Sequence, residues 1–389
     1  MSKILRSTNS STLKSKRKKV VLVCGTRPNV MKIFPLWKEM SNFPDNFQSM
    51  IIHTGQHYDD NMFQIFFDNF GLPSPDVRLG VGSGTHAEQT GRIMMKFEKV
   101  LLKEKPNLVL VAGDVNSTLA CSIAAAKLCI PLAHVEAGLR SFVRTMPEEI
   151  NRVITDSISD FLFTTCEDAN ENLKQEGIGK EKIYFVGNTM ADTLLEFRTK
   201  AKVKAKIKID KNDYALLTLH RPSNVENGNV FGNILKALQE VSKKIPIVFP
   251  AHPRTQKQIE FFGYKKYFSF INLNSSNSLN LRNSMNLLNP LSYLEFLNLM
   301  SNAKFVLTDS GGVQEETTIL GIPCLTLREN TERPVTVREG TNIVVGIDKG
   351  KIISESLKIL NDEYKTGTIP KLWDGKAAHR IINILKDKL

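Results

Sequence analysis

Short apolar runs, each closed by a polar loop, recur along the first half of the 389-residue chain. Runs rich in β-branched residues predict buried strands, and the longer amphipathic stretches between them predict helices. Strands that alternate with helices indicate a parallel sheet covered on both faces. The strands predicted for this half are residues 19–24, 49–54, 106–112, 131–135, 161–164 and 183–186, with helices at 30–40 and 117–128.

The same pattern starts again near residue 213, which predicts a second unit of the same kind. Its predicted strands are 214–219, 246–249, 268–272, 305–308 and 323–327, with helices at 230–241 and 293–300. The fold class is therefore predicted as α/β, with two Rossmann-like, doubly wound domains that face a cleft, a favoured place for ligands. The expected division is a basic tail (1–18), an N-terminal domain (19–197), a C-terminal domain (198–370) and a final helix (371–389) able to pack on the N-terminal domain.

The net charge of +12 fits a nucleic acid, a membrane surface or an anionic small substrate. One basic cluster, 14–19, lies in a Ser/Thr-rich start that we interpret as a flexible tail. The other, 200–211, is interpreted as a solvated linker or the edge of a strand. Neither cluster contains aromatic residues for base stacking. We therefore expect no nucleic-acid partner and favour an anionic small substrate.

The cysteines are scattered, without a CxxC pair and mostly among apolar neighbours. This spacing indicates reduced thiols in a cytoplasmic protein rather than disulfides or a zinc site. No apolar run approaches the about 18 residues of a membrane span, and no apolar segment follows the basic start as it would in a signal peptide. The expected location is cytoplasmic, with no membrane partner. The cysteines are Cys24, Cys121, Cys129, Cys166 and Cys324.

Three carboxylates stand at candidate loop ends of the first domain. Asp114 and Glu136 each follow an apolar strand, and Glu148 lies in the segment PEEINR. Arg152 comes four residues after Glu148, so a surface ion pair between them is the alternative interpretation. Several carboxylates at one edge of a sheet suit an enzyme that transfers protons, because crowded carboxylates raise one another's pKa.

Cations and small residues indicate anion binding in both domains. The segment GTRPNVMK follows a strand and opens a helix, where backbone N–H groups attract an anion, and Arg27 and Lys32 add positive charge. An ordinary turn with two surface cations is the alternative. In the second domain, a run of small residues would let a diphosphate approach the backbone N–H groups. A carboxylate that could accept hydrogen bonds from ribose hydroxyls follows, and then a further cation. These residues are Ser310, Gly311, Gly312, Glu316 and Arg333. His220 and His252 close two other strands and are either functional or structural.

Nine ordered segments, between about residue 19 and residue 347, resemble motifs of the non-hydrolysing UDP-N-acetylglucosamine 2-epimerases. The segments are GTRPNVMK, HTGQHYD, GDVNSTLA, HVEAGLRS, MPEEINR, GNTMADTL, LTLHRPSNVENG, DSGGVQEE and TERPVTVREGT. The resemblance implies the GT-B architecture, with the active site between two Rossmann-like domains. It also implies a UDP-sugar substrate, no metal or redox cofactor, and a homodimer.

The resemblance further implies a reaction and roles for its residues. The proton on C2 is removed and UDP is eliminated to give 2-acetamidoglucal; UDP then adds back after reprotonation on the opposite face. This converts UDP-GlcNAc to UDP-ManNAc, a precursor of surface polysaccharides. By motif match, Asp114, Glu136 and Glu148 are catalytic carboxylates and His220 is the catalytic histidine, with the acid and base roles left open. The candidates for holding the substrate are Arg27, Lys32, Arg152, His252, Ser310, Gly311, Gly312, Glu316 and Arg333.

The chain also departs from the family pattern. Members regulated by a second substrate molecule carry Gln-His-Arg where this chain has QHYD at 56–59, and residues 253–254 differ as well. Neither difference favours a regulatory substrate site. Asn29 replaces a Glu common in the first motif. The Asn/Ser-rich span 272–289 has no counterpart in the family pattern and is predicted to be a loop near the uracil.

Alternative functions stay open at this point. A relative of the same class would act on a 2,3-diacetamido or 6-deoxy UDP-sugar, and a hydrolysing epimerase would release UDP. A GT-B glycosyltransferase would need fewer carboxylates and an acceptor groove. A binding protein without activity would need a broken catalytic position, and all four expected residues are present.

Overall fold

The computed structural model describes residues 17–56, 67, 70–203, 211–271, 281 and 283–389. Parts of several sequence predictions lie outside the described residues: most of the basic tail, the loop at 57–59, the middle of the basic cluster 200–211, and much of the span 272–289. The side chain of Arg27 also lies outside them.

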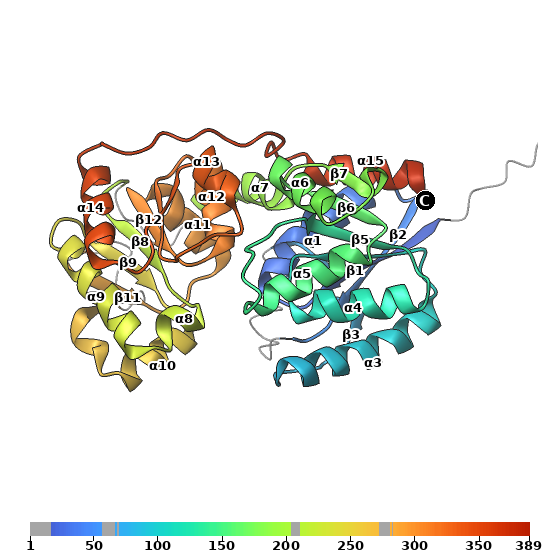
Figure 1. The fold of residues 1–389 in the computed structure, drawn as a ribbon, viewed down its shortest axis with the longest axis horizontal. Helices are drawn as coiled ribbons and strands as arrows, with labels where there is room; N and C mark the ends of the chain where they lie inside the picture. Colours follow the sequence, from blue (N-terminus) through green and yellow to red (C-terminus); the bar gives the residue numbers. More distant parts are fainter. Residues whose placement is uncertain (1–16, 57–66, 68–69, 204–210, 272–280, 282) are drawn as a thin grey trace, which may run out of the picture.

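The N-terminal half forms one parallel seven-stranded sheet with the order β3-β2-β1-β4-β5-β6-β7. Its central strands are buried along their length, because helices cover both faces (Figure 1). The strand order reverses between β1 and β4, so a topological switch point lies there. The strands are β1 (Lys18–Cys24), β2 (Phe47–His53), β3 (Val77–Arg78), β4 (Leu108–Ala112), β5 (Leu132–Ala137), β6 (Phe161–Thr164) and β7 (Ile183–Phe185). The helices are α1 (Arg27–Ser41), α3 (His86–Glu104), α4 (Asn116–Lys127), α5 (Pro147–Ser157), α6 (Glu167–Gln175), η1 (Lys180–Lys182) and α7 (Thr189–Val203).

The C-terminal half repeats this plan, with the order β10-β11-β9-β8-β12-β13-β14 and all pairs parallel. Its switch point lies between β8 and β12. The α/β prediction, with two doubly wound units, is confirmed; the domain boundaries given above stay a prediction. The strands are β8 (Ala215–Thr218), β9 (Ile247–Pro250), β10 (Phe268–Phe270), β11 (Met285–Leu288), β12 (Phe305–Thr308), β13 (Cys324–Thr326) and β14 (Asn342–Val344). The helices are α8 (Pro222–Val225), α9 (Gly228–Ser242), α10 (Pro253–Phe261), η2 (Tyr264–Tyr267), α11 (Tyr293–Asn302), α12 (Gly311–Leu320), α13 (Pro334–Arg338) and α14 (Lys349–Leu360).

The prediction of a loop over residues 272–289 is wrong at its end. The last residues of this span form strand β11, which pairs with both β9 and β10. The strand is short and carries Asn286, whose buried side chain donates to the carbonyl oxygens of Ile247 and Ser284, at 3.3 and 2.8 Å. The Asn interrupts the apolar pattern of this four-residue strand, so the sequence does not predict it. Pairing with the neighbouring strands determines its conformation instead of local β propensity.

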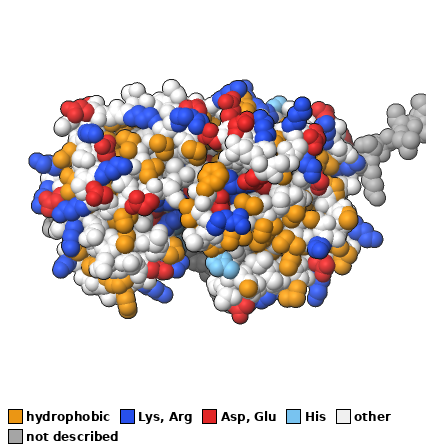
Figure 2. Space-filling view, viewed as in Figure 1, with side chains coloured by type: hydrophobic (Ala, Val, Ile, Leu, Met, Phe, Trp, Pro, Cys, Tyr) orange, Lys and Arg blue, Asp and Glu red, His pale blue; other side chains and the backbone are white. Residues whose placement is uncertain are grey.

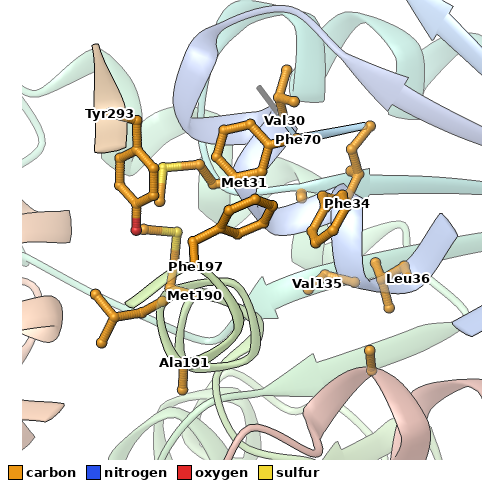
Figure 3. Close-up of a cluster of buried hydrophobic side chains, with 14 of the residues drawn as sticks. Val30, Met31, Phe34, Leu36, Phe70, Val135, Met190, Ala191, Phe197 and Tyr293 are labelled. Atoms are coloured by element: carbon orange, nitrogen blue, oxygen red, sulfur yellow. The ribbon is translucent and has the colours of Figure 1, made fainter. Parts of the chain in front are cut away.

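Aromatic side chains join the two units into a continuous core (Figure 3). Phe34 of α1 and Phe197 of α7 lie with ring centroids 5.2 Å apart, and Phe70 packs edge-on against both. Tyr293, which opens α11 of the second unit, lies 5.5 Å from Phe70. Buried aromatic surface therefore helps to hold the two units together.

The last helix, α15 (Ala377–Lys388), returns to the N-terminal unit and packs on α1 and α7 (Figure 1). Asp192 of α7 accepts hydrogen bonds from the backbone N–H groups of Ala377 and Ala378, at 3.2 and 2.9 Å. The indole Nε1 of Trp373 donates to the carbonyl oxygen of Thr165 at 2.8 Å. Asp192 thus satisfies the first N–H groups of a helix far away in sequence.

Replacing Asp192 by Ala is expected to lower the unfolding free energy by about 1 kcal/mol, the usual worth of such a cap. Burial raises the pKa of Asp192 to about 6, above the about 3.9 of an unfolded Asp. The ionised form is therefore disfavoured on folding, and the contribution falls as the pH rises between those values. Chemical denaturation should show the largest difference between wild type and variant near pH 4. A difference that grows toward pH 7 would contradict this.

The surface carries charges of both signs. Figure 2 shows acidic and basic side chains interspersed on the face viewed, rather than one continuous basic area. All five cysteines are free thiols. No helix in the described part of the chain is both long and apolar enough to span a membrane, and the described residues contain no cluster of three or more metal-ligating side chains.

Candidate active site

Two carboxylates emerge from neighbouring strand ends of the first sheet, Asp114 after β4 and Glu136 within the last residues of β5. The turn before Asp114 is made by Gly113, whose φ is +72°. A side chain at this glycine would place its Cβ 2.8 Å from the Lys32 Nζ. Glycine therefore permits both the left-handed turn and the approach of a cation.

Asp114 is paired with Arg152, which lies almost fully buried on α5. Asn151 holds the same residue by donating to its backbone oxygen at 2.8 Å. Burial alone raises the pKa of the Asp114 carboxyl, but the charges of Arg152 and Lys32 bring it below its ordinary value. Asp114 is therefore an ionised carboxylate at neutral pH and can accept a proton.

Glu136 adopts a left-handed backbone conformation, with φ of +72°, inside a strand. The register between β5 and β6 shifts at this point, between Val135 and Ala137. Such a bulge re-aims a side chain, and strain of this kind gathers at functional sites. The buried carboxylate contacts Lys32 and, in the second unit, Arg333. Burial raises its pKa, but these two cations lower it below the ordinary value.

Arg333 is the cation that joins the two units. Besides Glu136, its guanidinium lies 3.2 Å from Glu315 and 3.7 Å from Glu332. It also rests against the start of α12, because a Cβ added to Gly311 would lie 3.1 Å from it. The candidate diphosphate cation is thus in contact with both a candidate catalytic carboxylate and the candidate phosphate-binding turn.

The adjacent acidic residues of α5 have different surroundings. The side chain of Glu148 is half-buried and makes neither a hydrogen bond nor an ion pair with the described residues. Glu149 is buried and accepts hydrogen bonds from Ser141 N and Oγ, at 2.8 and 2.9 Å, and from Phe142 N, at 3.0 Å. Glu149 therefore fixes the preceding loop, while Glu148 is left available for a ligand.

The surface ion pair considered for Glu148 and Arg152 is wrong. Arg152 is 1% exposed and pairs with Asp114 and, at 3.6 Å, with Glu149. The i,i+4 spacing on α5 allows Glu148 to reach Arg152. The Arg152 guanidinium is buried, however, and pairs with the carboxylates beside it in the interior, Asp114 and Glu149.

His220 closes β8 in the second unit. Its Nδ1 lies 2.9 Å from Asp309 Oδ1, and 51% of its side chain is exposed. Asp309 is fully buried and also accepts from the backbone N–H groups of His220 and Arg221. Burial raises the pKa of Asp309, but the hydrogen bond from His220 brings it below its ordinary value. Asp309 thus directs the Nδ1 proton inward and leaves Nε2 facing out.

Replacing Asp309 by Asn is expected to lower turnover roughly 10- to 100-fold, because the imidazole loses its orienting carboxylate. The measurement is kcat alongside the melting temperature, so that a loss of folding is recognised. A folded variant with turnover close to wild type would contradict an orienting role for Asp309.

The turn into α12 contains Ser310, which precedes the helix without capping it. A Cβ on Gly312 would meet only Met190 Cε, at 3.8 Å, so packing does not require glycine there. Glu316 is buried and accepts a hydrogen bond from Tyr293 Oη at 2.9 Å. Burial raises its pKa to about 8, and burial raises that of the neighbouring Glu315 to about 7.

The structure puts His252 at the amino-terminus of α10, where its Nδ1 accepts from Arg254 N at 3.3 Å. Asn29, the unusual residue of the first motif, shapes the turn into α1. Its Oδ1 accepts from Thr26 N, at 3.1 Å, and its Nδ2 donates to Ala112 O, at 2.7 Å. It ties the ends of β1 and β4 together at the switch point.

The sequence model of one protein family, described as UDP-N-acetylglucosamine 2-epimerase, matches residues 38–386. A UDP-N-acetylglucosamine 2-epimerase of Methanocaldococcus jannaschii is 44% identical over 375 residues, which cover 94% of this chain and 98% of that protein. The chain belongs to the UDP-N-acetylglucosamine 2-epimerase family. A crystal structure of the Methanocaldococcus jannaschii enzyme in complex with UDP-GlcNAc and UDP superposes with a TM-score of 0.85, covering 95% of this chain and 99% of that one.

The same family includes a relative with a different substrate in its name. The UDP-2,3-diacetamido-2,3-dideoxy-D-glucuronate 2-epimerase of Pseudomonas aeruginosa is 40% identical over 341 residues, which cover 87% of this chain and 91% of that protein. Family membership therefore establishes the two-domain architecture and the class of enzyme, but it does not identify the sugar.

Proposed function

We propose that the protein epimerises C2 of a UDP-N-acetylhexosamine, converting UDP-GlcNAc to UDP-ManNAc without hydrolysis. The observation that carries this proposal is the ion pair between Glu136 of the first unit and Arg333 of the second. A carboxylate able to take a proton and a cation able to hold a diphosphate belong to different units and meet at one place. Elimination of UDP requires both groups at adjacent carbons of the sugar.

The proposed first half-reaction breaks two bonds. A carboxylate takes the proton from C2, the C1–O bond to UDP breaks with its electron pair leaving on UDP, and a C1–C2 double bond forms in 2-acetamidoglucal. Lys32 and Arg333 would stabilise the charge that grows on the departing diphosphate. In the second half-reaction C2 is reprotonated on the opposite face and the same UDP oxygen returns to C1.

We assign the catalytic roles to Asp114, Glu136, Glu148 and His220 without dividing acid from base among the carboxylates. The lowered pKa values of Asp114 and Glu136 keep both carboxylates ionised at neutral pH, so each has a lone pair free to take a proton. The exposed edge of His220 suits proton transfer at the leaving group. The remaining residues proposed to hold the UDP-sugar are Arg27, Lys32, Arg152, His252, Ser310, Gly311, Gly312, Glu316 and Arg333.

The second candidate substrate is a UDP-sugar with acetamido groups at both C2 and C3. The Pseudomonas aeruginosa relative supports it, since its identity to this chain is only slightly lower. Both substrates would use the same carboxylates and the same nucleotide site. We further propose, on family resemblance, that the enzyme is a cytoplasmic homodimer supplying surface-polysaccharide precursors.

Product analysis tests the proposal. Purified protein incubated with UDP-GlcNAc should give UDP-ManNAc and almost no free UDP. Release of UDP with free sugar would identify a hydrolysing enzyme instead. No conversion of UDP-GlcNAc, with conversion of the 2,3-diacetamido sugar, would select the second candidate.

A further inference from the structure

A histidine and an aspartate lie completely buried beneath the candidate catalytic carboxylates. His134 of β5 and Asp156 of α5 both have side chains that are 0% exposed. The His134 Nδ1 lies 2.6 Å from Asp156 Oδ1, and its Nε2 lies 2.8 Å from the carbonyl oxygen of Gly113. Neither side chain is open to solvent, so neither is available to touch a substrate.

The bond to Gly113 fixes the residue that precedes Asp114. The N–H group of Gly113 donates to the carbonyl oxygen of Val135 at 3.0 Å, while its own carbonyl oxygen accepts from His134. Gly113 has φ of +72°, outside the range that the strand would impose. Its backbone is held by hydrogen bonds through both of its polar groups, so the direction in which Asp114 leaves the strand is held as well.

The second oxygen of Asp156 holds the neighbouring strand end. It accepts from the backbone N–H of Gly138 at 3.1 Å and pairs with Arg140 Nη1 at 2.7 Å. Gly138 has φ of +79° and follows Glu136 by two residues. The two oxygens of one carboxylate therefore connect the end of β4, through His134, with the end of β5.

Both nitrogens of His134 face acceptors, Asp156 and the carbonyl oxygen of Gly113, and a neutral imidazole carries only one N–H group. Asp156 is also paired with Arg140. Burial raises the pKa of Asp156, but the contacts with His134 and Arg140 bring it below the ordinary value.

A buried ion pair of this kind adds little stability on its own, because desolvation offsets most of the attraction. What the pair does supply is directional: His134 bonds the backbone of Gly113, next to Asp114, and Asp156 bonds the backbone of Gly138, two residues after Glu136. We propose that His134 and Asp156 are positioning residues that set the geometry of Asp114 and Glu136 in the reaction. The inference rests on the proposed function, since it concerns the same site.

The test compares His134→Leu, His134→Gln and Asp156→Asn with wild type, measuring kcat, KM, UDP affinity and deuterium uptake at C2. His134→Leu removes both ring nitrogens and with them the bonds to Asp156 and Gly113, and should lower kcat about 100-fold, the loss that a displacement of about 1 Å can cause. UDP affinity should stay within about 3-fold, because Arg333 and α12 belong to the other unit. His134→Gln keeps one donor for Gly113 and should recover about 10-fold of the loss in kcat.

Asp156→Asn provides a second, isosteric variant should His134→Leu fail to fold; it cannot accept at both oxygens and should lose kcat similarly. The matched control is Asp192→Ala, another buried carboxylate that binds two backbone N–H groups, but at α15. Its kcat should equal wild type. A wild type without C2 exchange would refute the proposed function. A wild type with exchange, and folded variants with unchanged kcat or an equal loss of UDP affinity, would refute the positioning role alone.

Discussion

Replacing Asp114 by Asn is expected to lower turnover by about 10³-fold or more, while UDP still binds nearly as in the wild type. The substitution keeps the size of the side chain and removes its charge. Asp114 pairs with Arg152 at the end of β4, so the amide would leave the buried guanidinium without its main counter-charge and could not accept a proton. The nucleotide-binding groups proposed in the second unit would be unchanged.

The measurements for this variant are kcat with UDP-GlcNAc and UDP affinity by calorimetry. Asp160→Asn is a matched control. Asp160 lies just before the amino end of β6, whereas Asp114 follows the carboxyl end of β4, and the Asp160 side chain accepts a hydrogen bond from Leu132 N at 3.0 Å. This control should retain wild-type turnover. Full activity in Asp114→Asn would remove Asp114 from the catalytic set.

Replacing Arg333 by Gln is expected to weaken UDP binding and also to lower kcat, together by about 10²- to 10³-fold in kcat/KM. The guanidinium rests against the start of α12 and contacts Glu136 in the other unit. Its loss removes positive charge where the leaving diphosphate gains negative charge. Among the described residues, it also leaves Glu136 paired with Lys32 alone.

The control for Arg333 is Arg338→Gln, one turn later in the same loop–helix segment. Arg338 is 54% exposed and pairs with Asp168 on the surface, and such pairs contribute little. It should behave as the wild type in both UDP affinity and kcat. An Arg333→Gln variant whose kcat/KM matches that of Arg338→Gln would contradict the role given to Arg333.

The strands of this protein were predictable where apolar runs are uninterrupted. All eleven predicted strands overlap observed ones, because a strand buried on both faces shows as a continuous apolar run. The strands that were not predicted, β3, β11 and β14, have two to four residues. Runs that short carry too little pattern, and pairing within the sheet decides their conformation.

The candidate residues at the strand ends were also visible in the sequence, but their partners were not. Arg152 pairs with Asp114, 38 residues away, rather than with a helical neighbour. The contacts of Glu315, Tyr293 and Asp309 depend on how distant segments meet, which spacing along the chain does not encode. The one local signal for Glu149 was its place beside Glu148 in the first turn of α5.

The measurement that most directly tests the account is NMR of the UDP-sugars recovered after reaction in deuterium oxide. Proton removal at C2 followed by reprotonation from solvent predicts deuterium at C2 of the UDP-ManNAc formed, and at C2 of UDP-GlcNAc recovered at equilibrium. Product formed with its original C2 proton, or a substrate that shows neither conversion nor exchange at C2, would contradict the account.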